Sequence, residues 1–308
     1  MATEILVSDD DAGQRLDRWL KARDVPFAGL QKALRTGEIR VNSKRVDGAV
    51  RLHAGDKVRL PPQLQPDAAK APAPNNKAAL KQWQSLILFE DESFVALNKP
   101  AGLATQGGTG QKRSVDSLAQ LAFPTATPKL VHRLDKDTSG VLLLAKSRAA
   151  AAALAAQFAE HTAQKTYWAA VRGTVSKTQG VIRAGLSKGV GGAQLREMML
   201  VDYDAEILET EYTVLGRAKE LCWLALKPRE GRTHQLRVHC ASKNMPIYGD
   251  GKYGTAERGV RLHLHARRLS LEHPLTGRRL ELTAPLPPHM LTTWGLCGWD
   301  DGARPTPH

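Results

Sequence analysis

The chain has 308 residues, 42% of them hydrophobic, which is enough for a sizeable core and favours two domains over one. It carries 44 Lys and Arg residues against 31 Asp and Glu, and the formal charge of +13 suits a nucleic acid, an anionic membrane or an acidic protein as partner. The sequence shows no apolar run of about 18 residues, signal peptide, disulfide framework or zinc-ligand spacing, so we expect a soluble cytoplasmic protein without a structural metal.

The first 62 residues predict a small α/β domain. Arg15 to Leu34 has the apolar spacing of a helix, and Val25-Pro26 should divide it into two short helices because proline cannot continue the first. Gly37 would cap the second helix. The apolar residues that follow predict a small hairpin around Asn42-Ser43 and a last strand near Val58.

Basic side chains are concentrated in this first domain. Residues 15 to 60 hold twelve Lys or Arg residues against five Asp or Glu, which is seven of the thirteen net charges. A solvated surface would also explain such a run. However, the stretches Arg15-Leu16-Asp17, Gly37 to Asn42 and Gly55 to Val58 resemble the small RNA-binding domain first described in a ribosomal small-subunit protein. The resemblance favours RNA binding and implies RNA contacts from Arg15, Lys32, Arg35, Arg40, Lys44 and Arg45.

Residues 63 to 80 contain a run of Pro, Ala, Lys and Asn and are predicted to form a linker. From 81 to 299 the pattern predicts a larger domain, and residues 300 to 308 are expected to form a flexible tail. Strands are predicted at 87–89, 94–97, 141–145, 167–171, 210–215 and 222–226, and an alanine-rich helix at 148–160. This irregular alternation favours an α+β fold over a doubly wound parallel sheet. The glycine-rich segments 107–110 and 189–192 are predicted to be loops, and neither matches a nucleotide-binding pattern.

One polar segment stands directly before a predicted apolar strand. It runs from His132 through Asp135 to Gly140, and loops at the ends of strands often carry catalytic groups. The polar residues after Asp135 could simply make turn hydrogen bonds. Asp135 itself is harder to explain in this way, because its neighbour Leu134 should be buried.

Two further polar segments follow. One begins at Lys165 and includes Tyr167, a residue type that is more often part of a core than a ligand contact. The other, Gly231 to His239, alternates polar and apolar residues. If it is a strand, Thr233, Gln235 and Arg237 share one face, and a solvent-facing edge is the simple alternative.

Taken in order, these segments resemble the RluA/RluC family of ribosomal large-subunit pseudouridine synthases. The resemblance lies in Asn98-Lys99-Pro100-Ala101-Gly102-Leu103, His132-Arg133-Leu134-Asp135 with Thr138-Ser139-Gly140, Gly231-Arg232-Thr233-His234-Gln235-Leu236-Arg237 with Pro246-Ile247-Tyr248-Gly249-Asp250, Leu264-His265-Ala266, His273-Pro274 and Pro285-Leu286-Pro287. It implies a mixed, mostly antiparallel central sheet with flanking helices. Glu230 and Asn244 depart from the family pattern. Asn adopts left-handed backbone easily, so Asn244 should preserve the turn that precedes Pro246-Ile247.

The resemblance also implies roles for single residues. Asp135 would be the catalytic aspartate, Arg237 its ion-pair partner, and Tyr167 the aromatic that stacks on the target base. Arg133 would enter the RNA helix in place of the displaced uridine. Further RNA contacts are expected from His132, Lys165, Arg232 and Gln235. The expected partner is RNA, above all large-subunit ribosomal RNA, with no small-molecule cofactor, no membrane, and a monomeric chain.

Pseudouridine formation breaks the bond between ribose and a ring nitrogen, rotates the uracil, and rejoins it through carbon. One carboxylate suffices, as nucleophile on the sugar or base or as the base that removes a sugar proton, and the sequence leaves these choices open. Extruding the uridine costs roughly a few kcal/mol, whereas stacking on an aromatic returns about 1–3 kcal/mol. Two other functions are the alternatives. An aspartyl-phosphate enzyme is suggested by Asp135-Lys136-Asp137-Thr138, but the sequence offers no convincing set of magnesium carboxylates. A non-enzymatic RNA-binding or ribosome-assembly protein is the second, and the presence of Asp135, Tyr167 and Arg237 together argues against it.

Overall fold

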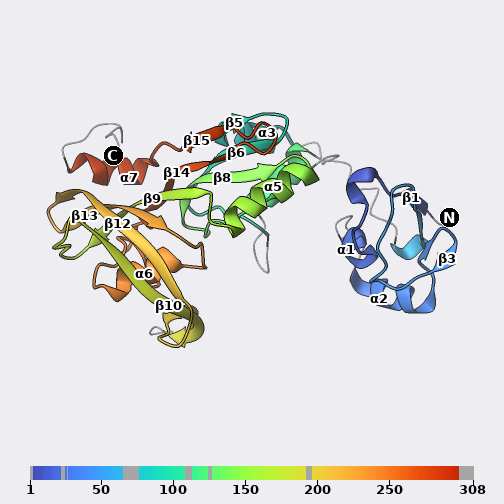
Figure 1. Cartoon of the computed structure of the whole chain (residues 1–308), viewed down its shortest axis with the longest axis horizontal. Coiled ribbons are helices and arrows are strands. Elements are labelled where there is room, and N and C mark those ends of the chain that lie inside the picture. The colour runs from blue at the N-terminus through green and yellow to red at the C-terminus, as the bar shows by residue number, and fades with distance from the viewer. Residues whose placement is uncertain are drawn as a thin grey trace. The chain divides into compact units, whose positions relative to one another are not determined.

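The computed structural model describes residues 3–21, 25, 27–64, 76–107, 113–123, 127–191 and 196–297. The chain divides into two compact units, residues 1–75 and 76–308 (Figure 1). The predicted linker is too long at both ends, because Leu64 is buried in the first core and residues 76–80 form the beginning of a helix. The middle of the linker, residues 65–75, and the predicted tail lie outside the described residues.

The first unit is a four-stranded antiparallel sheet with strand order β1-β4-β2-β3 and two short helices. Its core is built around Leu16, Trp19, Leu30 and Ile39, all of which are almost fully buried. The predicted helix pair and hairpin are confirmed. Its elements are β1 (Thr3–Leu6), η1 (Asp9–Asp11), α1 (Leu16–Lys21), α2 (Phe27–Thr36), β2 (Arg40–Val41), β3 (Lys44–Arg45), β4 (Lys57–Leu60) and η2 (Pro62–Leu64).

Two short turns of this unit behave as the sequence predicts. Gly37 has a φ of 71°, the left-handed conformation in which glycine ends a helix without steric cost. Asn42 and Ser43 have φ values of 49° and 65°, and two successive positive φ values are what a tight hairpin between β2 and β3 requires.

The second unit contains a mixed sheet of eleven strands among the described residues. Nine of them follow the order β11-β10-β12-β13-β9-β14-β8-β6-β5, while β15 pairs with β14 and β7 with β8. The pair β8–β14 is parallel and the other recorded pairs are antiparallel, which confirms the mixed, mostly antiparallel sheet. The strands are β5 (Ile87–Glu90), β6 (Phe94–Lys99), β7 (Lys129–Leu130), β8 (Ser139–Ala145), β9 (Gln164–Arg172), β10 (Gln179–Gly191), β11 (Arg196–Val201), β12 (Ile207–Ala218), β13 (Leu221–Pro228), β14 (Leu264–Glu272) and β15 (Arg279–Thr283).

Helices cover both faces of the sheet at β6 and β8. On one face Val141 and Leu143 pack with the helix α5 (Arg148–Ala159). On the other, Leu142 and Leu144 pack with α3 (Asn76–Leu86) and α4 (Val115–Ala122). Because both faces are buried, β8 is apolar without alternation, and its position in the middle of a layered structure is visible in Figure 1.

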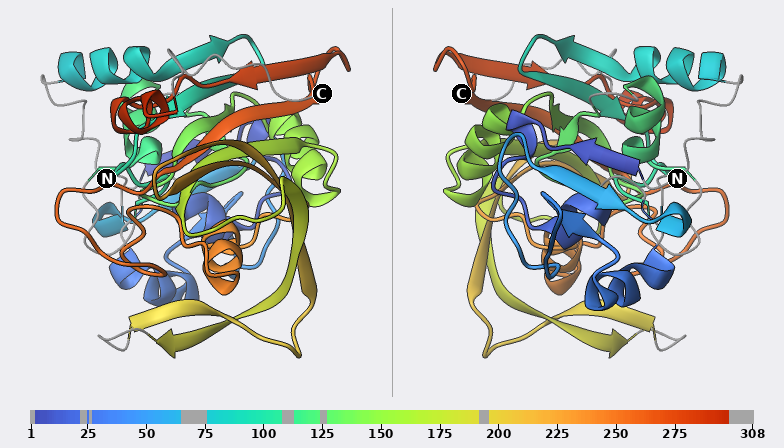
Figure 2. Two further views of the ribbon diagram at one scale, coloured as in Figure 1. Left: turned by 90° about the vertical axis from the view of Figure 1, so that its left-hand side faces the viewer. Right: turned by 90° about the vertical axis from the view of Figure 1, so that its right-hand side faces the viewer.

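The part of the sheet formed by β9, β10, β12 and β13 curves around the helix α6 (Gln235–Ser242), as Figure 2 shows. Leu236 and Cys240 of α6 pack there with Ala169, Leu224 and Leu226 of the sheet. The last helix, α7 (Pro288–Gly295), places Trp294 against Trp168 of β9 with ring centroids 4.6 Å apart. None of the helices among the described residues is long and apolar enough to cross a membrane.

Two expectations about local structure differ from what the structure shows. The strand that was considered for 231–239 is not formed: residues 233–234 form a turn and Gln235 begins α6, so Thr233, Gln235 and Arg237 do not share a strand face. Residues 189–191 are not a loop but the end of β10, paired with β11. Of the other predicted glycine loop, residues 108–110 lie outside the described residues.

Candidate active site

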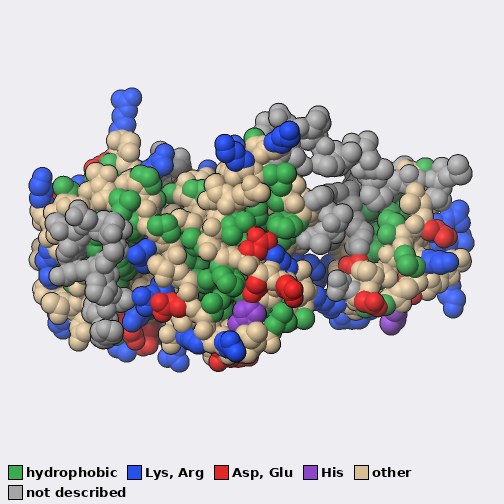
Figure 3. Space-filling model, turned by 90° about the horizontal axis from the view of Figure 1, so that it is seen from above, with side chains coloured by type: hydrophobic (Ala, Val, Ile, Leu, Met, Phe, Trp, Pro, Cys, Tyr) green, Lys and Arg blue, Asp and Glu red, His purple; other side chains and the backbone are tan. Residues whose placement is uncertain are grey.

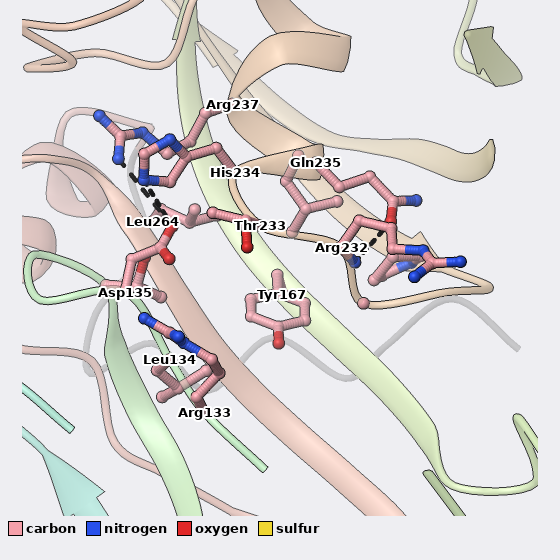
Figure 4. A pocket seen from close by; sticks show the side chains of 14 residues that line it. Arg133, Leu134, Asp135, Tyr167, Arg232, Thr233, His234, Gln235, Arg237 and Leu264 are labelled. Carbon is pink, nitrogen blue, oxygen red and sulfur yellow. Dashed lines mark hydrogen bonds and ion pairs between the residues drawn. The ribbon is translucent and has the colours of Figure 1, made fainter. Parts of the chain in front are cut away.

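A pocket in the second unit collects residues from all three polar segments (Figure 4). Asp135 comes from the connection between β7 and β8, Tyr167 from β9, and Arg237 from α6. The lining consists of Arg133, Leu134, Asp135, Thr138, Tyr167, Pro228, Gly231, Arg232, Thr233, His234, Gln235, Leu236, Arg237 and Leu264. Segments up to about 100 residues apart in sequence thus meet at one place, and Asp135 lies at its edge with 20% of its side chain exposed.

The loop that carries Asp135 is fixed on both sides of that residue. Leu134 is buried, and its backbone exchanges hydrogen bonds with the hydroxyl of Thr105, 2.6 Å at the carbonyl and 3.2 Å at the amide. On the other side the amide of Thr138 donates to the carbonyl of Asp135 at 3.1 Å. Gly140, with a φ of 111°, lies so close to the carbonyl of Ala266 that a Cβ atom would collide with it. The contacts that fix this loop are therefore made by the backbone and by residues on either side of Asp135, and not by the Asp135 carboxylate.

Lys99 is hydrogen-bonded to this loop, and the sequence interpretation gave it no role. Its side chain is fully buried, and its ammonium donates to the carbonyls of Pro100 at 3.1 Å, Leu103 at 2.7 Å and Lys136 at 3.0 Å. Burial lowers the pKa of Lys99 to about 8, although the charges of Asp137 and Asp135 act in the opposite direction. The resemblance of residues 98–103 to the family pattern pointed to this segment. Only the fold shows that Lys99 binds the carbonyl of Lys136, the residue after Asp135.

Arg237 has a closer partner than the one the resemblance implied. Its Nε and Nη2 atoms each donate to Asp250 at 2.8 Å, a bidentate pair in which the Asp250 side chain is completely buried. Its Nη1 atom is 3.9 Å from Oδ2 of Asp135, an ion-pair distance that is too long for a hydrogen bond. Burial works against charge on both partners, but the strong bonds between them lower the pKa of Asp250 and raise that of Arg237. Asp250 thus holds a cation at a set distance from Asp135.

His234 is a pocket residue to which the sequence interpretation gave no role. Its Nε2 atom lies 3.7 Å from Oδ2 of Asp135, and its Nδ1 atom is 2.7 Å from the hydroxyl of Tyr253. Burial lowers the pKa of His234, and the attraction of the Asp135 carboxylate only partly offsets this. Figure 4 shows His234 and Arg237 converging on Asp135 from the same side of the pocket.

Tyr167 lies across the pocket from these groups (Figure 4). Its strand position is fixed by pairing with Leu226 of β13 and Ala266 of β14. Burial, supported by the negative charge of Asp135, raises the pKa of the Tyr167 phenol, so the ring stays neutral at physiological pH. An aromatic ring held at the wall of a pocket beside a carboxylate can stack on a flat base.

The other residues of this unit that were expected to contact RNA fall into two groups, those that line the pocket and those that do not. Arg133 and Arg232 line the pocket and are exposed, and Arg232 makes a 3.2 Å ion pair with Glu206. Gln235 also lines it, but the Gln235 side chain is buried and bonded to protein groups that include the carbonyl of Glu209. Lys165 donates to the carbonyls of Arg229 and Glu230 and is not among the lining residues.

His132 has a structural position and does not line the pocket. Its Nε2 atom accepts a 2.9 Å hydrogen bond from the amide of Leu143, and its ring stacks on Phe158 with centroids 4.4 Å apart. Burial lowers the pKa of His132 to about 3, which leaves the ring neutral.

The two departures from the family pattern are also accommodated: Glu230 accepts from the amide of Glu209, and Asn244 adopts a φ of 55°.

The basic residues of the first unit that were expected to contact RNA are exposed. Arg15 is paired with Asp17 at 2.8 Å, and Arg35 lies beside it at a shallow pocket. Arg40 and Arg45 both direct guanidinium groups to backbone carbonyls at the end of α2. Lys32 and Lys44 complete the set on α2 and β3.

Comparison with known proteins identifies the family to which this chain belongs. The family model described as RNA pseudouridylate synthase matches residues 93–242, which include Asp135, Tyr167 and Arg237. The chain is 38% identical over 292 residues to the ribosomal large subunit pseudouridine synthase C of Vibrio vulnificus, covering 91% of each protein. The chain belongs to the RNA pseudouridylate synthase family. It is an RNA pseudouridine synthase, an isomerase.

Other relatives agree with this family assignment. The ribosomal large subunit pseudouridine synthase C proteins of Pasteurella multocida and Escherichia coli are 39% and 37% identical to the chain, which covers 91% and 92% of their lengths, with 93% and 92% of the chain aligned. Among solved structures, human RNA pseudouridylate synthase domain containing 4 matches with a TM-score of 0.59 and 25% identity, over 72% of this chain and 97% of that one.

Proposed function

We propose that this pseudouridine synthase modifies large-subunit ribosomal RNA and that Asp135 is its reacting carboxylate. The substrate part of the proposal rests on relatives of nearly equal length that are named ribosomal large subunit pseudouridine synthase C. The observation that carries the catalytic part is the Asp135 carboxylate, which stands partly exposed at the edge of a pocket opposite an aromatic ring.

The reaction places definite demands on the pocket. The bond from C1′ of the ribose to N1 of uracil breaks, a bond from C1′ to C5 forms, C5 loses its proton and N1 gains one. A carboxylate near the sugar, ionised and oriented by cations, can serve in any of the three ways that the sequence leaves open. Arg237 places a positive charge 3.9 Å from Oδ2 of Asp135. Its hydrogen bonds to Asp250 keep the guanidinium from moving closer to the Asp135 carboxylate.

The remaining residues support a flipped-out substrate. Tyr167 offers a stacking surface worth about 1–3 kcal/mol per base, which offsets part of the cost of unstacking. Arg133 is exposed at the rim beside Asp135, so its guanidinium can occupy the space that the uridine leaves in the RNA helix. Each unit, taken by itself, shows Lys and Arg side chains on its surface (Figure 3), and repeated phosphate contacts require such cations.

The experiment uses the loss of hydrogen from C5. Large-subunit ribosomal RNA from cells lacking the protein is labelled with tritium at C5 of uridine and incubated with purified enzyme, and tritium in water is counted. We expect Asp135→Asn to lower the single-turnover rate by roughly 10³-fold or more, with RNA affinity within about threefold of the wild type because phosphate contacts set affinity.

A matched control is available in the same turn. Asp137→Asn removes an equal charge from an exposed residue that does not line the pocket, and its rate should stay within about twofold of the wild type. Full activity of Asp135→Asn would exclude the carboxylate role. Tritium release from transfer RNA but not from large-subunit RNA would instead exclude the substrate and leave the carboxylate role standing.

A further inference from the structure

The backbone of His234 is held in a conformation that histidine rarely adopts. It is the residue before the first turn of α6, and its φ of 56° lies in the left-handed region, where the backbone of a residue other than glycine is strained. Such strain persists only where surrounding contacts hold the residue, and it is frequent at functional sites. The strained backbone here directs the imidazole into the pocket beside Asp135.

Tyr253 is the hydrogen-bond partner of Nδ1 of His234. The Tyr253 hydroxyl accepts a hydrogen bond from the amide of Met199 at 3.0 Å and lies 2.7 Å from Nδ1 of His234, where it can donate its own proton. The rings of Tyr253 and His234 also meet edge to face, with centroids 5.4 Å apart. In the neutral imidazole, acceptance at Nδ1 leaves the hydrogen on Nε2. That nitrogen faces Asp135.

The Nε2 atom of His234 is closer to the carboxylate than the guanidinium is. It lies 3.7 Å from Oδ2 of Asp135, against 3.9 Å for Nη1 of Arg237, and a shift of about 0.7 Å would make a hydrogen bond. Catalytic hydrogen bonds commonly tighten in this way when the substrate binds. Burial keeps His234 neutral, because it lowers the pKa of the imidazole. A neutral donor can orient a carboxylate without cancelling its charge.

We propose that His234 is a positioning residue for the reaction: its Nε2–H holds Oδ2 of Asp135 and leaves Oδ1 to face the uridine, while Tyr253 fixes the required tautomer. The inference rests on the proposed role of Asp135. It assigns to His234 and Tyr253 an effect on the chemical step and not on RNA affinity.

Two substitutions at position 234 separate the donor from the backbone. His234→Asn suits the left-handed conformation, and its short amide can reach Tyr253 but not Asp135. His234→Gln places an N–H donor near the former Nε2 position. We expect the single-turnover rate of tritium release to fall about 10- to 100-fold in His234→Asn and to recover to within about fivefold of the wild type in His234→Gln. RNA dissociation constants should stay within about threefold, and melting temperatures confirm that both variants fold.

Tyr253→Phe tests the tautomer. It should slow the single-turnover rate by about three- to tenfold in the wild-type background and have almost no further effect when added to His234→Asn, because the two side chains then act as one unit. A rate for His234→Asn within twofold of the wild type would overturn the inference. Equal loss in His234→Asn and His234→Gln would also overturn it, since the effect would then belong to the backbone. Activity of Asp135→Asn, by contrast, would show that the proposed function has failed first.

Discussion

At the scale of single residues, the buried pair of Arg237 and Asp250 is the most consequential contact of the site. Asp250 is completely buried and also accepts from the amides of Lys252 and Tyr253. Asp250→Ala would leave the Arg237 guanidinium buried without its main partner, which typically costs about 3–5 kcal/mol. We therefore expect the free energy of unfolding, measured with urea, to fall by that amount. Replacing both residues with apolar ones, Arg237→Met with Asp250→Leu, should restore the part of this loss that comes from the unpaired guanidinium, but not the part that comes from the amides of Lys252 and Tyr253. A cost below about 1 kcal/mol for Asp250→Ala would contradict this account.

The same pair shows where residue-level prediction stopped. One pocket is lined by residues that the resemblance to the family had singled out, namely Arg133, Asp135, Tyr167 and Arg237. The sequence could not predict that Arg237 binds Asp250 more closely than Asp135, because Asp250 lies in a turn that only the tertiary fold brings near α6. His234 escaped notice for a related reason: neither its left-handed φ nor its bond to Tyr253, 19 residues later, leaves a pattern in the sequence.

At the scale of elements, there is a clear physical cause for the failure to predict a helix within 231–239. A helix is recognised by an apolar stripe along one face. In α6 residues 235–240 are all buried, because the sheet curves around the helix, so polar and apolar residues alternate without producing such a stripe. The strands β6 and β8 were predictable because residues 94–97 and 141–145, which are buried in the sheet, form uninterrupted apolar runs. The end of β10 was missed because glycines, which usually mark loops, occur there inside a paired strand.

Two chain turns of the second unit are joined by Asp91 and His273, and this contact predicts a pH dependence of stability. Asp91 accepts from Nε2 of His273 at 2.6 Å, and from the amides of Ser93 and Phe94. Burial would raise the pKa of Asp91, but these hydrogen bonds outweigh it and lower the pKa to about 2. Because the folded state favours the charged form, the stabilisation is present above the ordinary aspartate pKa of about 4 and is lost as the pH falls toward 2.

Asp91→Asn should therefore destabilise the protein by about 1–2 kcal/mol at pH 7, a figure reduced for the partial exposure of the pair. Urea unfolding of both proteins between pH 7 and pH 3 should show the difference shrinking below about pH 4. A difference that stays constant down to pH 3 would show that the charge of Asp91 is not its source.

At the scale of the whole molecule, the charge of the first unit predicts a salt-dependent contribution to RNA binding. Lys32, Arg35 and Lys44 are exposed on α2 and β3. Each phosphate that a cation neutralises releases counterions, so replacing all three with Ala in the full chain should reduce the slope of log affinity against log salt by about 2–3 units. The rate at saturating RNA should be unchanged, because the pocket lies in the second unit. The matched control, Lys32→Arg with Arg35→Lys and Lys44→Arg, keeps every charge and should keep the wild-type slope. If the alanine variant also keeps it, these cations do not touch RNA and the first unit contributes through other contacts.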